Sequence, residues 1–343
     1  MLPVVRTLQK YWPNTELTWV IGKLEAKLIG DIPGISFVIF DKSAGWLEYL
    51  KLYKKISPQK FDIILHLQTS MRANLISLLI SGNICLGFDR ARAKDWQWIF
   101  TNHQIIKQSR QHVLDSFFGF IETLGIQKRL LNWDIPIPDC ADAVANKYLP
   151  GDEEILMISP CANARFRNFR NWTIEGYAAV AEYAVTRHKM KIVLTGGPTS
   201  EERRYGEGIS QQARCEVLNL IGKTTLKELL AILKKATVLI SPDSGPAHMA
   251  TAVGTPVIGL YATTNPDRAR PYLSAEWVVS KYPEAVRMVY GKEVSEMPWG
   301  TRARQEDMMA LITKEAVIKK LDQLLEKLSL SNSNEDVQKI GSV

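Results

Sequence analysis

The segment S-P-D-S-G-P-A-H-M-A at 241–250 places a polar turn directly after a run of aliphatic residues. Pro246 has the fixed φ that suits the first turn of a helix, and the free N–H groups of such a helix start favour phosphate. His248 lies in that turn, where its ring can donate to a phosphate or sugar oxygen. A plain turn in which Asp243 or Ser244 caps the helix accounts for the segment equally well.

A second segment, residues 158–172, also follows an aliphatic run and carries Arg165, Arg167 and Arg170. Guanidinium groups at the carboxyl end of a strand can neutralise the charge that develops on a diphosphate leaving group. The alternative is a solvated basic loop.

The third segment, L-T-G-G-P-T-S-E-E at 194–202, ends in Glu201 and Glu202. A carboxylate at such a strand exit can hold ribose hydroxyls. Two exposed acids that favour the dipole at a helix N-terminus give the same pattern.

Basic residues gather in G-F-D-R-A-R-A-K at 87–94, which contains Arg90, Arg92 and Lys94. Arg72 and Arg110 lie on other segments of the same half. Together these side chains suit an acidic acceptor, although each one taken alone also fits an ordinary surface charge.

Short aliphatic runs alternate with helix-period segments along nearly the whole chain, which predicts doubly wound α/β units with parallel sheets. The predicted strands are 17–21, 35–40, 63–67, 84–88, 155–159, 191–195, 217–221, 237–241, 256–261 and 277–280. The prolines of D-I-P-I-P-D at 134–139 indicate a linker near 132–150. We therefore expect domains at 1–140 and 141–330, followed by a flexible tail at 331–343.

Two helix starts have clear signals. Thr173 can cap a helix, with Trp172 and Tyr177 spaced as a hydrophobic staple, and T-L-K-E at 225–228 has the spacing of a capping box.

Composition narrows the class of protein. The 343 residues are 46% hydrophobic and 23% charged, as in an ordinary globular protein. No apolar run is long enough for a membrane span and no signal peptide is visible, so we expect a cytoplasmic protein. The four cysteines and five histidines lack metal-ligand spacing. A nicotinamide dehydrogenase is disfavoured because no G-x-G-x-x-G follows a predicted strand.

The net charge is +7. Residues 1–150 hold 18 Lys and Arg against 13 Asp and Glu, and the rest of the chain holds 25 against 23. The first half could therefore meet an anionic partner, but it lacks the dense basic stripe of a nucleic-acid binder.

The chain resembles the family 9 glycosyltransferases, the ADP-heptose:lipopolysaccharide heptosyltransferases, over roughly residues 2–325. The most specific matches are S-P-D-S-G-P-A-H-M-A at 241–250 and G-T-P-V-I-G-L-Y-A at 254–262, followed by Asn265-Pro266. Supporting matches are R-N-W at 170–172, G-G-P-T-S-E-E at 196–202, N-L-I-G-K-T at 219–224, L-P-V-V-R-T-L at 2–8, W-V-I-G-K-L-E at 19–25 and G-F-D-R-A-R-A-K at 87–94. The likeness is greatest to members of the heptosyltransferase I type.

The resemblance implies a GT-B architecture, two Rossmann-like domains facing each other across a cleft. It implies an inverting transfer of L-glycero-D-manno-heptose from ADP-heptose, without a metal or cofactor. The implied donor site comprises Asp243, Ser244, Gly245, Pro246, His248, Ser159, Arg170, Arg167, Glu201 and Glu202. Arg170 would replace a pyrophosphate-binding lysine, with the choice over Arg165 and Arg167 left open, and one of the two glutamates would hold the ribose.

The implied acceptor is the Kdo and lipid A inner core of lipopolysaccharide, at the cytoplasmic face of the inner membrane, so the protein could be peripheral there. Its acidic groups would meet Arg72, Arg90, Arg92, Lys94 and Arg110. The alternatives are a family 9 enzyme with another nucleotide-sugar, or a nucleotide-sugar-binding protein without catalysis.

The chain departs from the family pattern at its start. Family members begin with a central strand and a Gly-Asp loop whose aspartate is thought to act as general base, whereas the first predicted element here is the helix at 2–8. No residue of this chain can therefore be assigned as the base. We favour a fragment, or a start site assigned too late, over a genuine truncation that leaves the protein unstable or inactive.

Overall fold

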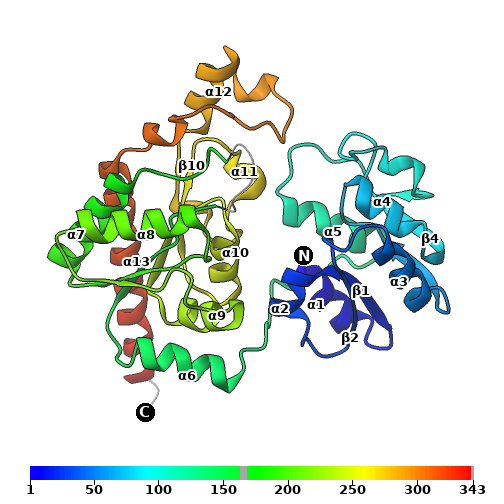
Figure 1. The fold of residues 1–343 in the computed structure, drawn as a ribbon, viewed down its shortest axis with the longest axis horizontal. Helices are drawn as coiled ribbons and strands as arrows, with labels where there is room; N and C mark the ends of the chain where they lie inside the picture. The colour runs from blue at the N-terminus through cyan, green and yellow to red at the C-terminus, as the bar shows by residue number, and fades with distance from the viewer. Residues whose placement is uncertain (163–167, 341–343) are drawn as a thin grey trace. The chain divides into compact units, whose positions relative to one another are not determined.

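The computed structural model describes residues 1–162 and 168–340. The chain forms two compact units, Met1–Pro136 and Ile137–Val343 (Figure 1). The division between them falls inside the predicted linker at 132–150.

Within its described residues, the second unit contains one six-stranded parallel sheet. The strands are β6 (Ile155–Ile158), β7 (Lys191–Leu194), β8 (Val217–Asn219), β9 (Val238–Pro242), β10 (Val257–Tyr261) and β11 (Val278–Ser280). Their order across the sheet is β11-β10-β9-β6-β7-β8. Every residue of β6, β9 and β10 is buried, because helices cover both faces of the sheet. These strands lie where the aliphatic runs predicted them.

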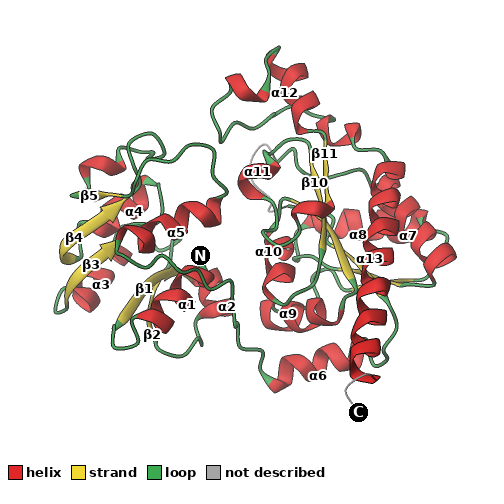
Figure 2. Cartoon of the chain, turned by 180° about the vertical axis from the view of Figure 1, so that it is seen from behind, coloured by secondary structure: helices red, strands yellow, loops and turns green. Residues whose placement is uncertain are grey.

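Helices cover the two faces of this sheet. They are α6 (Asp139–Tyr148), α7 (Ile174–His188), α8 (Ser200–Gln212), α9 (Leu226–Lys235), α10 (Gly245–Ala252), α11 (Pro266–Ala269), α12 (Tyr282–Tyr290) and α13 (Lys314–Ile340). Helices α7, α8 and α13 pack on one face, where Tyr177, Ile209 and Leu321 share one core. Helices α9 and α10 lie on the other face (Figure 2). Helix α13 continues through most of the segment expected to form a tail.

Both predicted helix starts are confirmed. The Thr173 hydroxyl accepts from the Gly176 N–H at 3.1 Å, and Trp172 meets Tyr177 edge to face with ring centroids 5.0 Å apart. At the start of α9, Thr225 and Glu228 form a reciprocal capping box. Both signals are local, since each involves residues only a few positions apart in the sequence.

The strands of the first unit form two separate parallel sheets. β1 (Leu17–Gly22) pairs with β2 (Ile35–Phe40), and β4 (Ser81–Gly87) pairs with β3 (Lys60–Leu65) and with β5 (His103–Gln104). Among the residues described, no strand joins β1 to β3. Helix α1 (Leu2–Tyr11) is the first element described, as the sequence predicted.

The remaining helices of the first unit are α2 (Lys23–Ile29), α3 (Leu47–Ile56), α4 (Met71–Ser77) and α5 (Val113–Thr123). Leu2 of α1 and Ile29 of α2 pack against Ile21 of β1 in one apolar cluster. A second cluster joins Leu52 of α3 to Val38 of β2, with side chains of α4 packed against it. Within the described residues, no helix is both long and apolar enough to span a membrane.

Candidate functional site

The candidate site lies at the carboxyl end of the sheet in the second unit, where the strand order reverses. The chain leaves β6 toward β7 on one side and later returns to β9 on the other, so β6 and β9 are neighbours. In open α/β sheets, ligands bind in the crevice that forms beside such a reversal. The loop after β6 and the turn after β9 carry two of the three segments that the sequence singled out.

The turn after β9 leads directly into α10. Ser244 occupies the N-cap position but does not cap the helix, because its hydroxyl pairs instead with the Ser241 hydroxyl at 2.7 Å. Gly245 is exposed, and a Cβ placed on it would meet no atom within 4 Å. Pro246 stands in the first turn, and His248 is exposed one turn into the helix. The first amides of α10 thus open onto free space, as an anion site requires.

Arg170 connects the loop after β6 to this turn. Its Nη1 donates to the Asp243 carbonyl oxygen at 3.0 Å and lies 3.5 Å from the Asp243 carboxylate. Asn168 orients the guanidinium by accepting from its Nε at 3.3 Å. Ser159 is buried, and its backbone N–H donates to Ile240 across the two strands at 3.0 Å. Arg165 and Arg167 lie outside the described residues.

The two glutamates after β7 have different surroundings. The Glu202 carboxylate accepts from the Gly197 N–H and from the Thr199 hydroxyl, each at 2.6 Å, so both its oxygens stabilise the strand exit. The Glu201 carboxylate is about half exposed (49%), and one of its oxygens, Oε1, accepts from Asn171 at 3.4 Å and from Arg204 at 3.2 Å. Glu201 is therefore the glutamate whose carboxylate is open to a ligand.

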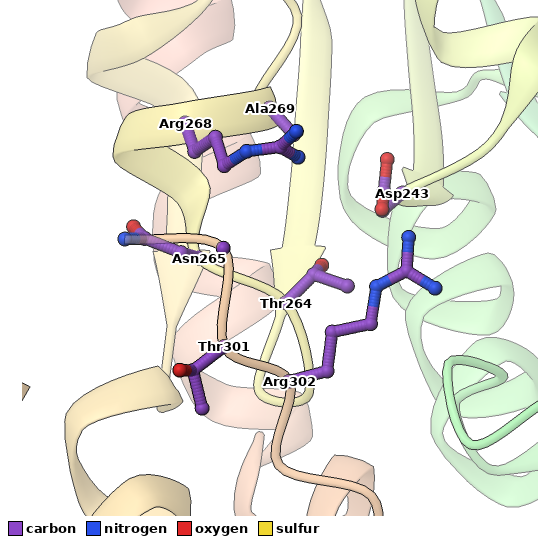
Figure 3. Close-up of a pocket in the computed structure, with 8 residues that line it drawn as sticks. Asp243, Thr264, Asn265, Arg268, Ala269, Thr301 and Arg302 are labelled. Atoms are coloured by element: carbon purple, nitrogen blue, oxygen red, sulfur yellow. The ribbon is translucent and has the colours of Figure 1, made fainter. Parts of the chain in front are cut away.

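A pocket lies beside Asp243, and most of its lining was missed by the sequence analysis (Figure 3). The guanidinium groups of Arg268 and Arg302 lie on its wall, and Figure 3 shows the Arg302 side chain extending toward Asp243. Hydroxyl and amide groups supply other polar atoms. The lining residues are Asp243, Thr264, Asn265, Arg268, Ala269, Gly300, Thr301 and Arg302.

Arg302 is held in place by backbone contacts. It pairs with Thr264 in an isolated antiparallel bridge just after β10. Its carbonyl oxygen accepts from the Tyr290 hydroxyl at 2.7 Å, and the neighbouring Thr301 carbonyl accepts from the Tyr282 hydroxyl at 2.9 Å. Both tyrosines belong to α12. The segment 281–302 therefore positions the Arg302 guanidinium at the carboxyl end of the sheet.

Positive charge is crowded around this pocket. Burial lowers the pKa of Arg302, and the nearby Arg170, Arg304 and Arg268 lower it further, whereas Asp243 opposes the shift. Asp243 is one carboxylate among several guanidinium groups. A bound anion would relieve the repulsion between these cations, so the pocket suits a phosphate or carboxylate group.

The predicted acceptor residues all follow the carboxyl ends of strands in the first unit. The Arg92 side chain is already bound by the protein, since its guanidinium donates to Gln111 at 2.6 Å and to the Ile106 carbonyl at 2.8 Å and also pairs with Asp89. Arg90 lies over the Trp98 ring at 5.2 Å. Exposed side chains are those of Arg72, Arg90, Lys94 and Arg110.

Comparison with known proteins gives consistent matches. The chain matches the family model described as glycosyltransferase family 9 (heptosyltransferase) over residues 49–297. It is 38% identical over 323 residues to the lipopolysaccharide core heptosyltransferase OpsX of Haemophilus influenzae, covering 94% of this chain and 92% of that protein. A lipopolysaccharide heptosyltransferase 3 of Escherichia coli is 23% identical, with 94% of each chain covered.

Solved structures resemble the fold. A glycosyl transferase of family 9 from Veillonella parvula superposes with a TM-score of 0.77 at 22% identity, covering 95% of this chain and 93% of that one. The E. coli heptosyltransferase WaaC, solved with ADP, superposes with a TM-score of 0.68 at 16% identity and covers 94% of each chain.

Proposed function

The chain belongs to glycosyltransferase family 9, and from that premise we propose that it transfers L-glycero-D-manno-heptose from ADP-heptose to the Kdo and lipid A inner core of lipopolysaccharide. It is an enzyme, a glycosyltransferase with the GT-B fold, and its homologues act in assembly of the lipopolysaccharide core. The observation that carries the assignment of the donor site is the contact of Arg170 with Asp243 beside the uncapped start of α10.

The donor diphosphate would lie over the first turn of α10, with Gly245 leaving room for it. Backbone amides and the dipole at this helix start attract negative charge. Arg170 and Arg302 would bind the phosphate oxygens, while the carboxylate of Asp243 accepts from hydroxyl groups of the sugar. Glu201 would accept from the ribose hydroxyls, since both oxygens of Glu202 are already used by the protein.

The transfer itself would be an inverting displacement. An acceptor hydroxyl attacks the anomeric carbon of the heptose, the bond from that carbon to the diphosphate breaks, and ADP leaves. The guanidinium groups around the pocket would neutralise the charge that builds up on the departing diphosphate, which is a reason to propose catalysis without a metal. The attacking hydroxyl must lose its proton to a base, and no residue of the chain is assigned to that step.

The acceptor would meet the first unit. Its exposed basic side chains, Arg72, Arg90, Lys94 and Arg110, suit the carboxylates of Kdo and the phosphates of lipid A. We expect Arg92 to support this region from within, because its donors are bound by the protein. A lipid acceptor would bring the enzyme to the cytoplasmic face of the inner membrane.

The direct test is to incubate the protein with ADP-heptose and Kdo-lipid A and to measure released ADP. We expect release that depends on both substrates. Thermal shift with ADP-, UDP- and GDP-sugars tests the alternative donors, and stabilisation by a UDP- or GDP-sugar alone would contradict the proposal. Stabilisation by ADP-heptose without any ADP release would identify a non-catalytic binding protein.

Gly245 offers a steric test of the donor site. Replacing Gly245 with valine is expected to weaken ADP binding at least about tenfold, because the new side chain would fill the space above the first amides of α10. The free energy of unfolding should change by less than about 1 kcal/mol, since Gly245 is exposed and a Cβ there has open space around it.

Calorimetric titration with ADP and a denaturant curve measure the two effects. Gly151→Val is the control, because Gly151 is also exposed in the second unit and a Cβ on it would have no neighbour closer than 3.8 Å. Equal ADP affinity in Gly245→Val and the unaltered protein would place the diphosphate elsewhere.

A further inference from the structure

Large exposed apolar side chains concentrate in the first unit. The second unit has few, for example Leu273 and Met288, although it is the longer of the two. Two helices of the first unit, α3 and α4, carry several of them in regular spacing. These side chains are Trp46, Leu47, Leu50, Tyr53, Met71, Leu75 and Leu78.

Helix α3 has an apolar face that is wider than its contact with the core. Leu52 and Ile56 are buried against the sheet. Trp46, the N-cap residue, and Leu50 and Tyr53, at positions i, i+4 and i+7, form a stripe along the edge of this face, where they are 69%, 47% and 50% exposed. An ordinary surface helix buries its apolar stripe and turns a polar face to solvent. The exposed stripe therefore needs an explanation beyond folding.

Helix α4 shows an inverted pattern. Its buried residues are the polar Asn74 and Ser77. The apolar Met71, Leu75 and Leu78, again at i, i+4 and i+7, are exposed. The donors on the inner side are bound by the protein, since the Asn74 amide nitrogen donates to the Asp95 carbonyl and the Ser77 hydroxyl donates to the Asn74 carbonyl at 2.7 Å, whereas the buried Asn74 Oδ1 has no partner among the residues described.

The two stripes lie on neighbouring helices. Leu52 and Tyr49 of α3 share one apolar cluster with Ile76 of α4 and with Leu79, just beyond it. Both helices are therefore anchored on the same core. We call their exposed apolar side chains together the α3–α4 surface: Trp46, Leu47, Leu50, Tyr53, Met71, Leu75 and Leu78.

The charges beside this surface are mostly positive, although the exposed Asp95 lies beside α4, where its carboxylate accepts from the Met71 N–H at 3.0 Å. Lys51, Lys54 and Lys55 are exposed on α3, and Arg72 is exposed at the start of α4. The acid on α3, Glu48, is 13% exposed in its side chain and pairs with Lys51 at 3.5 Å. Exposed tryptophan, tyrosine and leucine side chains flanked by lysines are the chemistry that inserts at the headgroup level of an anionic bilayer.

We infer that the α3–α4 surface binds the face of a bilayer that contains anionic lipid. The apolar stripes enter the boundary between headgroups and acyl chains, and the lysines bind lipid phosphates. The inference rests on the proposed function only in that a lipid-linked acceptor would bring the enzyme to the membrane surface. The exposed stripes and their charge are observed independently of the reaction.

Vesicle co-sedimentation tests this inference without any acceptor present. The unaltered protein should pellet with vesicles of phosphatidylglycerol and phosphatidylcholine in equal parts, and less so at high salt or with phosphatidylcholine alone. Leu50→Ser with Tyr53→Ser removes part of the stripe, and Lys51→Glu with Lys54→Glu reverses two charges. Each pair should lower the partition coefficient at least about tenfold.

The matched control is Leu273→Ser with Met288→Ser, which removes two side chains of the second unit that are 55% and 59% exposed. This control should bind vesicles as the unaltered protein does. Failure of the unaltered protein to pellet, or equal binding by all variants, would overturn the inference. So would a dimer, seen by analytical ultracentrifugation, that the Leu50→Ser and Tyr53→Ser pair dissociates in the absence of vesicle binding.

A second measurement separates this inference from the reaction. Transfer to a deacylated, water-soluble acceptor should be the same in the α3–α4 variants and the unaltered protein. Vesicle binding without transfer to any acceptor would contradict the proposed function and leave the membrane surface standing.

Discussion

Replacing Arg302 with alanine is expected to weaken ADP binding about 10- to 100-fold, the effect of losing one or more hydrogen bonds to a charged group. Transfer should slow by at least the same factor, because the guanidinium would also stabilise the departing diphosphate. The fold should persist, since the contacts that hold this segment, to Thr264 and to the Tyr290 hydroxyl, are made by backbone. Titration calorimetry and ADP release measure the two losses.

Arg304→Ala is the matched control. It removes the same side chain two residues further along, where Arg304 is exposed and adds to the positive charge near Arg302 but does not line the pocket, so it tests the effect of charge without contact. Arg302→Lys should fall between the two, because lysine keeps the charge but not the planar fork that binds two oxygens. If Arg302→Ala slows transfer with unchanged ADP affinity, Arg302 serves the acceptor and its assignment to the diphosphate is wrong.

Replacing Trp172 with alanine is expected to lower the free energy of unfolding of the second unit by about 3–5 kcal/mol. The ring is 1% exposed and packs against Tyr177, and its Nε1 donates to the Ile312 carbonyl oxygen at 2.9 Å. It also explains a glycine in the first turn of α7, because a Cβ on Gly176 would lie 2.5 Å from the indole. Chemical denaturation followed by circular dichroism measures the change.

Two variants frame the result for Trp172. Trp172→Phe and Trp172→Ala both leave the Ile312 carbonyl unpaired. Trp172→Phe keeps an aromatic ring beside Tyr177, so it should lower the free energy of unfolding by less than the alanine variant does. Trp46→Ala removes a tryptophan that is 69% exposed and should change stability by no more than about 0.5 kcal/mol. A loss below about 1 kcal/mol for Trp172→Ala would mean that the start of α7 is not held by this side chain.

Much of the second unit could be predicted from the sequence because its signals are local. The run that becomes β9 begins with three aliphatic residues, Val238, Leu239 and Ile240, which is the pattern of a strand buried on both faces. Thr225 and Glu228 lie three residues apart, so their capping box is visible before any fold is known. The turn at 243–248 could be placed for the same reason: a strand must end and a helix must begin there.

The pocket could not be predicted, because its parts are distant in sequence. Arg302 meets Asp243 only after α12 and the bridge to Thr264 bring the chain back to the sheet. No spacing rule connects these positions. For the same reason, the structural role of Arg92 could not be predicted. Its partners Gln111 and Ile106 lie well beyond the basic cluster in sequence, so only the tertiary structure distinguishes Arg92 from its basic neighbours.

The two sheets of the first unit are joined in an unusual way. Within the residues described, no backbone ladder connects β1 with β3. The two sheets are connected instead through apolar side chains, since Leu52 of α3 and Ile76 of α4 pack in one cluster with Val38 of β2. Hydrophobic attraction weakens on cooling and strengthens on warming. Hydrogen-bonded strand ladders, in contrast, weaken on warming. The contact between these two sheets should therefore be the cold-sensitive part of the first unit, more stable at growth temperature than on ice.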